Sequence, residues 1–320
     1  MRFCFEPLPK SFVLYKPAQR ESYDIARIYE LEKHDELIIT RKRDGWKLFV
    51  VKAGDKWKVY TDGMREVTSY VPDVVQELRG LPVANGTVYV CEGIVDEDDS
   101  DNFSLVGSIL NSRTAERAIA RQLEIGFIQC MPFEIAFKNG GCSLELPYHE
   151  RLSMIQETFQ SSFLFLSPVP VLDMSFDDAQ KLVSEKGWEG LVLYAKDFVG
   201  SYRIDGKAPR RPNGCYKWKP IFEDDFFARE WIPYPEYPDR LKEVKLLQVD
   251  QKTGKEVDCG VLGTLSVSMR EELRKKFTRK KSTPVVLQVA FEARNPSGKL
   301  RNKRFVRIRK DKKWDECFCP

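Results

Sequence analysis

The sequence has few of the residues that build metal centres or disulfide frameworks. Its 320 residues include two histidines, His34 and His149, and eight cysteines scattered along the chain. No paired cysteine or histidine spacing typical of a zinc site occurs. No apolar run is long enough for a membrane span, and the opening residues lack a signal peptide. We therefore expect an intracellular protein with reduced cysteines and no membrane contact.

The length and the charge distribution suggest two domains and a charged partner. A chain of 320 residues exceeds the usual single domain, so two cores are expected. The net charge is only +4, but residues 96–101 are acidic, whereas residues 274–281 and 301–313 concentrate lysine and arginine. Such a basic end suits a polyanion, and from charge alone a solvated face is an equally good interpretation.

Lys42 lies where a predicted strand ends. It follows the apolar pair Ile38 and Ile39, and the turn dipeptide Asp44-Gly45 comes directly after it. A lysine held in a partly dry cleft among other cations loses part of its preference for the charged form and can attack phosphorus or carbon. On these few residues alone, an exposed hairpin is the simpler interpretation.

Predicted strands and helices alternate up to residue 220. Apolar runs on both sides of Gly54-Asp55 predict a hairpin at residues 48–60, and Gly187 is a predicted helix C-cap. Further strands are expected at residues 87–95, 127–135 and 188–194. Helices are expected at residues 21–32, 71–78, 111–124, 147–152 and 177–186.

Four charged residues lie in or beside predicted apolar strands. A carboxylate such as Glu92 or Glu189 costs free energy there unless a metal, a hydroxyl or a cation pairs with it. Lys217 and Lys219 alternate along a strand, so both ammonium groups are expected on one face, where they would bind an anion. These four residues are therefore candidates for a site.

The sequence pattern changes after Pro220. Short predicted strands with turns between them indicate a small all-β barrel. Its last strand, residues 304–312, is expected to place Phe305, Arg307, Arg309 and Asp311 on one face.

Taken in order, these features resemble the covalent nucleotidyltransferase superfamily and, within it, the ATP-dependent DNA ligases. Each matching motif is short, but all of them occur in the family's order through nearly the whole chain. The motifs are KRDG at 42–45, EG at 92–93, PFE at 132–134, EGLVLY at 189–194, CYKWKP at 215–220 and RFVRIRKDK at 304–312. Segments 147–152, 254–260, 268–273 and 289–292 also resemble ligases.

The resemblance implies an α+β fold with two domains. Residues 1–220 would form a nucleotidyltransferase (adenylation) domain of ATP-grasp-like antiparallel sheets with helices. Residues 221–320 would form an all-β OB-fold barrel that swings between closing over ATP and clamping DNA. Because no DNA-binding domain precedes the core, we expect a monomeric, minimal ligase of the viral and bacterial type.

The implied reaction seals nicks in duplex DNA with ATP and Mg²⁺ or Mn²⁺. A lysine attacks the α-phosphate of ATP, AMP passes to a DNA 5′-phosphate, and a 3′-hydroxyl displaces AMP. The resemblance assigns catalysis to Lys42, Asp44, Lys217 and Lys219, and metal binding to Glu92 and Glu189. Among the implied nucleotide contacts, Phe133 would stack on adenine, and Arg309, Asp311 and Lys312 would orient pyrophosphate. The full set of implied contacts is Thr40, Arg41, Lys42, Lys47, Glu92, Phe133, Glu189, Lys217, Lys219, Arg309, Asp311 and Lys312.

The chain departs from the ligase pattern at several positions. Thr61-Asp62 stands where ligases usually carry Ser-Arg, which removes a phosphate-binding arginine that Arg65 would have to replace. Lys47 stands where arginine is common and keeps the charge without the bidentate fork. Tyr194 replaces a common lysine, and Lys303 a common proline.

Three other functions remain as alternatives. An mRNA-capping guanylyltransferase would share KWKP at 217–220 and the Arg-x-Asp-Lys ending, but Glu189-Gly190 favours a ligase because capping enzymes usually have Asp-Gly there. An RNA ligase is disfavoured by the terminal OB domain and its motif. A non-enzymatic OB nucleic-acid binder is disfavoured by the intact Lys42, Glu92, Glu189, Lys217 and Lys219.

Overall fold

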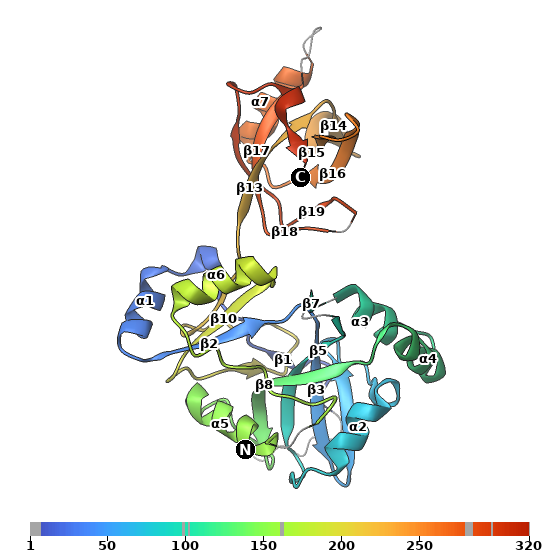
Figure 1. Cartoon of the computed structure of the whole chain (residues 1–320), viewed down its shortest axis with the longest axis vertical. Helices are drawn as coiled ribbons and strands as arrows, with labels where there is room; N and C mark the ends of the chain where they lie inside the picture. The colour runs from blue at the N-terminus through green and yellow to red at the C-terminus, as the bar shows by residue number, and fades with distance from the viewer. Residues whose placement is uncertain are drawn as a thin grey trace. The chain divides into compact units, whose positions relative to one another are not determined.

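The computed structural model describes residues 8–97, 100–101, 103–160, 163–278, 284–295 and 297–319. The chain divides into two compact units, Met1–Lys219 and Pro220–Pro320. Figure 1 shows the helices and strands of each unit. Each unit encloses its own apolar core, so each is described by itself.

Two antiparallel sheets form the framework of the first unit. One has five strands in the order β4-β3-β5-β8-β9, and the other has three in the order β12-β10-β2. The strands of these sheets are β2 (Leu37–Lys42), β3 (Trp46–Ala53), β4 (Lys56–Thr61), β5 (Val88–Ile94), β8 (Gln129–Lys138), β9 (Gly141–Cys142), β10 (Gly190–Ala195) and β12 (Cys215–Trp218). Short pairs are formed by β1 (Val13–Leu14) with β11 (Tyr202–Arg203), and by β6 (Asp96–Glu97) with β7 (Ser100–Asp101).

Helices and 3₁₀ turns complete the unit. The helices are α1 (Ala26–Lys33), α2 (Pro72–Arg79), α3 (Phe103–Leu110), α4 (Ala115–Ile125), α5 (Tyr148–Thr158) and α6 (Phe176–Lys186). The 3₁₀ turns are η1 (Arg20–Ser22) and η2 (Thr68–Tyr70). In Figure 1, α1 and α6 lie side by side against β2 and β10, and α3 and α4 lie on the other side of the unit.

The five-stranded sheet is buried on both faces because its strands are apolar at nearly every position. Successive strand side chains point to opposite faces. Leu48 and Val50 of β3 therefore enter one core with residues of α2, α3 and α4, whereas Phe49 and Val51 enter the core shared with the three-stranded sheet. The space between the two sheets is thus a place where both can present side chains.

Most of the elements predicted for this unit are confirmed. The β3–β4 hairpin, the strands β5, β8 and β10, and the helices α2, α5 and α6 all occur, with Gly187 as a left-handed C-cap. The helix expected at residues 21–32 was wrong at its start: α1 begins at Ala26, whose N–H donates to the Asp24 carboxylate at 3.0 Å. The prediction also missed α3, which is only eight residues long and buries Val106, Ile109 and Leu110. Helix α4 starts only at Ala115, after the Thr114 cap.

In the residues that the structure describes, the second unit is a seven-stranded sheet with one α-helix, α7. Its long strand β15 pairs with β13, β14, β16 and β21, and irregular registers interrupt the pairings with β14 and β16. The expectation of an exclusively β tail overlooked α7, whose Leu273 is buried in the core. The elements are β13 (Phe222–Ala228), β14 (Trp231–Tyr234), β15 (Tyr237–Asp250), β16 (Glu256–Leu262), α7 (Val267–Phe277), β17 (Val285–Phe291), β18 (Ala293–Arg294), β19 (Leu300–Arg301), β20 (Arg304–Ile308), η3 (Trp314–Glu316) and β21 (Phe318–Cys319).

The last predicted strand is shorter than expected and does not keep one face. β20 ends at Ile308, before Arg309 and Asp311. A register shift in its pairing with β17 lies between the pairs Val289–Phe305 and Gln288–Arg307. Phe305 therefore packs on the core, whereas Arg307 lies at the surface and donates to Gln288. This bulge explains why the alternation of strand side chains wrongly predicted that Phe305 and Arg307 lie on the same face.

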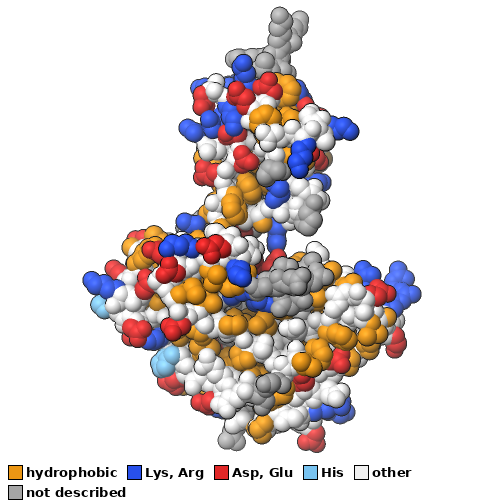
Figure 2. Space-filling view, in the orientation of Figure 1, with side chains coloured by type: hydrophobic (Ala, Val, Ile, Leu, Met, Phe, Trp, Pro, Cys, Tyr) orange, Lys and Arg blue, Asp and Glu red, His pale blue; other side chains and the backbone are white. Residues whose placement is uncertain are grey.

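Basic side chains of the second unit form ion pairs with acidic ones. Lys245 pairs with Glu230, and Arg229 pairs with Glu256. Figure 2 accordingly shows blue and red side chains interspersed on the visible face of the second unit. On that face the charge pattern is mixed, and it does not form one continuous basic patch.

Some sequence expectations fall on residues outside the described ranges. These are Cys4, Asp98 and Asp99 of the acidic segment, and residues 279–281 of the basic segment 274–281. The seven cysteines that are described have free thiols. No helix in the described ranges combines the length and the apolar character that a bilayer crossing requires.

Candidate active site

Lys42 is the last residue of β2 and lies at the passage from one sheet to the other. β2 belongs to the three-stranded sheet and β3 to the five-stranded sheet, so Lys42–Gly45 is not a hairpin turn. Gly45 is required because a Cβ there would lie 2.2 Å from the carbonyl oxygen of Gly93. Its N–H donates to Oε1 of Glu92 at 3.0 Å. The Asp-Gly dipeptide thus allows a close backbone approach that fixes Lys42 between the sheets.

A cavity of about 440 Å³ opens beside Lys42. Of the charged side chains that line it in the described part of the chain, seven are basic and one, Glu92, is acidic. The basic ones are Lys16, Arg41, Lys42, Arg43, Lys47, Arg211 and Lys217. Such an excess of positive charge in a concave, partly buried site favours a multiply charged anion.

Glu189 connects Lys42 to Lys219. Oε2 of Glu189 contacts Nζ of Lys42, and Oε1 accepts from Nζ of Lys219 at 2.9 Å. The side chain of Glu189 is only 13% exposed. Gly190 permits this arrangement, since a Cβ on it would lie 2.2 Å from the carbonyl oxygen of Trp218. The nearest charged partner of Lys42 is therefore a carboxylate, and the other cations of the cavity lie around this ion pair.

Glu92 lies on β5 directly opposite Lys47 of β3. Burial raises the pKa of its carboxyl from 4.5 to about 7, and the nearby Glu189 adds to that rise. Lys42, the Gly45 N–H and Lys47 act in the opposite direction, but burial is the larger effect. Glu92 therefore changes charge near neutral pH, where a bound cation would shift it fully to the carboxylate.

We expect Glu92→Gln to stabilise the fold in a pH-dependent way. Because the folded-state pKa is raised, the folded acid stays protonated between pH 4.5 and 7 while the unfolded acid ionises, so wild-type stability falls over that window. The full deficit is about 3 kcal/mol above pH 7. Glutamine avoids this cost and still accepts from Gly45. Urea unfolding at pH 5 and pH 8 should show a larger gain at pH 8.

A matched control for that measurement is Glu30→Gln, because Glu30 is an exposed acid on α1. Its substitution should change stability by less than about 0.5 kcal/mol at both pH values. An equal gain for Glu92→Gln at pH 5 and pH 8 would contradict a raised carboxyl pKa.

An apolar wall closes one side of the cavity. It is formed by Leu14, Phe133, Val169, Val192 and Tyr194. Phe133 is half-buried, so part of its ring faces the cavity and part contacts Ile94, Met131 and Val169. A flat aromatic side chain at a cavity wall can stack on a planar ring, and the stacking of Phe133 on adenine stays a prediction.

Buried polar contacts behind the wall fix Tyr15. Arg151 and Glu134 are fully buried, and Arg151 donates from Nε and Nη2 to the Glu134 carboxylate at 2.7 and 2.9 Å. The Tyr15 hydroxyl donates to the same carboxylate at 2.7 Å. Tyr194 stacks on Tyr148, with ring centroids 3.7 Å apart. Tyr15 and Tyr194 both line the cavity, so these contacts hold two side chains of its wall in place.

The structure brings most of the predicted site residues together. Thr40, Arg41, Lys42, Lys47, Glu92, Phe133 and Lys217 line the cavity, and Glu189 and Lys219 join it through Lys42. Asp44 is not part of the described lining. Arg309, Asp311 and Lys312 belong to the second unit and contact one another or Asp225 there.

The structure shows what Asp62 does at the position where ligases usually carry arginine, and where Arg65 lies. Asp62 accepts from Nζ of Lys47 at 3.1 Å, so it holds a cavity lysine. Arg65 donates to the carbonyl oxygen of Leu110 at 2.6 Å and does not line the cavity. The phosphate contact that a usual arginine would make is thus not supplied by Arg65.

Sequence reasoning missed several cavity residues, among them Arg43, Arg211, Tyr15 and Lys16. Arg43 lies inside the KRDG motif, and its position next to Lys42 could have predicted that it lines the cavity. Arg211 comes from the loop rich in glycine, proline and arginine before β12, and it donates to the carbonyl oxygen of Pro17 at 3.1 Å. Tyr15 and Lys16 lie next to β1, in a stretch whose mixed composition gave no signal.

The carboxylates suit Mg²⁺ only in combination with other ligands. Among the described residues, no group of three acidic, histidine or cysteine side chains comes together as a metal site. Both oxygens of Glu189 are engaged by lysines, which leaves Glu92 as the carboxylate that lines the cavity. Magnesium commonly takes one or two carboxylates and completes its shell with phosphate oxygens and water. The donor set fits a metal that enters together with phosphates.

Comparisons with known proteins agree with this geometry. The family described as "ATP dependent DNA ligase domain" matches residues 18–219. A DNA ligase of Nanoarchaeum equitans is 22% identical over 306 residues, covering 86% of this chain and 53% of its own length. A DNA ligase of Archaeoglobus fulgidus is 26% identical over 299 residues, covering 86% of this chain and 52% of its own length. The chain spans about half the length of these curated relatives.

Solved structures show the same fold. A Lig E DNA ligase structure aligns with a TM-score of 0.63 at 16% identity, covering 93% of this chain and 99% of the other. The structure titled Pmar-Lig PreS3 aligns with a TM-score of 0.62 at 17% identity, covering 92% of this chain and 68% of the other. The fold is therefore a mixed helix-and-sheet, nucleotidyltransferase-like ligase fold. Because the family match covers more than half of the chain, this protein belongs to the family of ATP-dependent DNA ligase domains.

Proposed function

We propose that this chain is an ATP-dependent DNA ligase that joins a 5′-phosphate to a 3′-hydroxyl at a nick in duplex DNA. The observation that carries the proposal is Lys42 at the edge of a cavity lined by seven basic side chains and one carboxylate. A triphosphate is the kind of ligand that such a charge excess favours. The family relationship supports the reaction class, and the position of Lys42 at the cavity supports its role as the nucleophile.

The first chemical step is the attack of Nζ of Lys42 on the α-phosphorus of ATP. The new N–P bond forms as the bond between the α-phosphorus and the pyrophosphate oxygen breaks, which gives a lysyl adenylate and pyrophosphate. The amine must lose a proton, and Oε2 of Glu189 is the acceptor in contact with it. Lys217 and the arginines of the cavity stabilise the charge on the phosphate oxygens.

Glu92 would hold Mg²⁺ or Mn²⁺ together with phosphate oxygens. Glu189, the second metal ligand that the resemblance implies, would join it by releasing one of its two lysines. When bound, the metal neutralises phosphate charge during the transfer of AMP. Phe133 would stack on the adenine. These assignments rest on the cavity lining and on the family motifs, since the described residues alone do not complete a metal shell.

The second unit is proposed to be an OB-fold domain that begins at about residue 220. The long strand β15, with its irregular pairings to β14 and β16, and the helix α7 support this assignment. Arg309, Asp311 and Lys312 are proposed to orient the pyrophosphate leaving group. The proposed partner is nicked duplex DNA, and the proposed state of the enzyme is monomeric.

The test is transfer of a labelled nucleotide. The protein is incubated with α-labelled ATP or GTP and Mg²⁺, and then with a nicked DNA duplex or a nicked RNA strand. We expect the label to move from ATP onto the protein, to pass to the DNA 5′-phosphate, and to leave as AMP when the strand is sealed. Label taken only from GTP would instead indicate a capping guanylyltransferase. Sealing confined to RNA would indicate an RNA ligase, and absence of label would leave a nucleic-acid binder.

A further inference from the structure

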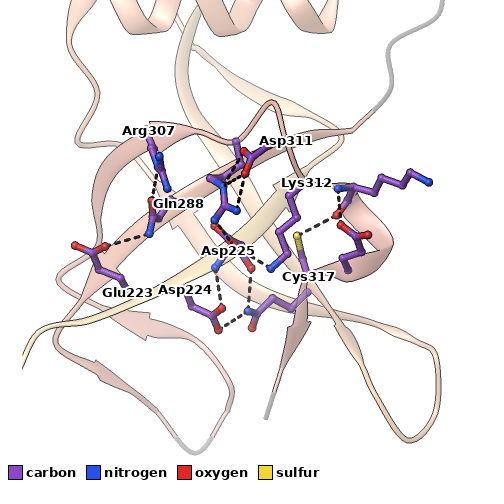
Figure 3. Close-up of polar contacts among 12 residues, drawn as sticks. Glu223, Asp224, Asp225, Gln288, Arg307, Asp311, Lys312 and Cys317 are labelled. Carbon is purple, nitrogen blue, oxygen red and sulfur yellow. Dashed lines mark hydrogen bonds and ion pairs between the residues drawn. The ribbon is translucent and has the colours of Figure 1, made fainter.

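Asp225 of β13 binds two of the residues that are proposed to act on pyrophosphate. Its Oδ2 accepts from Nη1 of Arg309 at 2.8 Å and from Nζ of Lys312 at 2.9 Å (Figure 3). The Asp225 side chain is 10% exposed, whereas those of Arg309 and Lys312 are 20% and 26% exposed. One nearly buried carboxylate oxygen therefore holds two cations that still reach the surface.

The surroundings of Asp225 fix its backbone. Gln248 is fully buried and donates both to the carbonyl oxygen of Asp225 at 3.1 Å and to the Asp224 carboxylate at 2.8 Å. The other oxygen of that carboxylate accepts from the N–H of Asp225 at 2.8 Å. Gln248 is itself held by Arg294, whose Nη2 donates to it at 2.7 Å. Asp225 is thus a fixed point to which the longer side chains attach.

The second carboxylate on Arg309 has a different character. Asp311 accepts from Nε and Nη2 of Arg309, both at 2.9 Å, but its side chain is 67% exposed. Hydrogen bonds from Arg309 hold the pKa of Asp311 down at about 2, so this carboxylate is ionised at neutral pH. An exposed ion pair contributes little and exchanges readily with water or with another anion. The Nε–Nη2 edge of Arg309 therefore presents to solvent a fork that a phosphate group also fits.

We propose that Asp225 is a positioning residue for nucleotide transfer: it anchors Arg309 and Lys312 as a preformed pair of cations, while Asp311 gives way to the phosphates of the leaving group. The inference rests on the proposed function and adds to it a residue outside the family motifs quoted above. Two neighbouring cations repel each other, and both side chains lose rotamer freedom when they are fixed. A buried carboxylate between them offsets both costs before substrate arrives, which is how preorganised sites gain rate.

The test compares Asp225→Asn with Glu223→Gln. Both replacements remove one carboxylate charge from β13, but Glu223 accepts from Gln288 and contacts neither Arg309 nor Lys312 (Figure 3). We expect Asp225→Asn to slow formation of the lysyl adenylate from ATP about tenfold or more at saturating ATP, because the amide no longer holds both cations. Sealing of a nick that already carries AMP should change less than about twofold, because no pyrophosphate leaves in that step.

A second comparison separates anchoring from folding. In a background with Arg309→Ala and Lys312→Ala, Asp225→Asn should cause no further loss, because residues that act through one another are non-additive. Asp225→Glu retains the charge but moves the carboxylate by one methylene, and we expect a smaller loss that is again confined to adenylate formation. This variant keeps the test open if Asp225→Asn fails to fold.

Each result decides one of the two proposals. Wild-type rates in Asp225→Asn and Asp225→Glu would overturn the anchor, as would equal losses in adenylate formation and in sealing of the adenylated nick. A loss that persists in the double-alanine background would also overturn it. If wild type and Glu223→Gln take no label from ATP, the proposed ligase function itself fails. Label in these two proteins together with slow labelling of Asp225→Asn would establish the anchor.

Discussion

Lys42→Ala is expected to abolish the lysyl adenylate and, with it, the sealing of 5′-phosphorylated nicks. The amine of Lys42 is the atom that forms the bond to phosphorus, and alanine leaves no nucleophile at that place. Removal of a covalent nucleophile lowers the rate by at least about a thousandfold. Arg43 is adjacent, but a guanidinium stays protonated and cannot replace the amine. The measurement is covalent labelling with α-labelled ATP, followed by denaturing electrophoresis.

A matched control for this variant is Lys58→Ala. Lys58 lies on β4 in the same unit and makes an exposed ion pair with Glu66 at 3.7 Å. Its removal should leave the labelling unchanged, because surface pairs contribute little. A nick that already carries AMP bypasses the missing step, so Lys42→Ala should still seal it better than a 5′-phosphorylated nick. Label found on Lys42→Ala at the wild-type level would refute the assignment of the nucleophile.

Much of the site followed from the sequence because its parts are local. Lys42, Asp44 and Gly45 lie within four residues, and the apolar strands around Glu92 and Glu189 have clear patterns. The confirmed strands β5 and β10 place both glutamates near Lys42.

Contacts that depend on strand register or on irregular backbone could not be predicted. The contact of Glu189 with Lys219 requires β10 and β12 to pair with Leu191 opposite Trp218. No pattern within either strand sets that register. The bulge that separates Phe305 from Arg307 is invisible to an alternation rule. Arg211 enters the cavity from a loop whose path is set by tertiary packing.

The link between Lys42 and Lys219 can be tested through Glu189→Gln, for which we expect a loss of about a hundredfold or more in adenylate formation. The amide oxygen of glutamine can accept from one of the two lysines. Its NH₂ group is a donor, so it cannot accept a hydrogen bond from the ammonium group of the other lysine. One of the two lysines therefore loses its ion pair with residue 189 in a site where Glu189 is 13% exposed and Lys219 is 15% exposed. Unmatched charges in such a site are costly and move away from their positions.

Comparison variants show whether charge or position matters at Glu189. Glu185→Gln makes the same chemical change at an exposed position of α6, and it should not alter labelling. Glu189→Asp keeps the charge but has a side chain one methylene shorter, so it is expected to contact one of the two lysines but not both. This variant should lose less activity than Glu189→Gln. Single-turnover labelling with ATP measures all three variants, with circular dichroism to verify folding. If folded Glu189→Gln labels within about twofold of wild type, then Glu189 neither orients Lys42 nor accepts its proton, and the amine must be activated by the cavity cations instead.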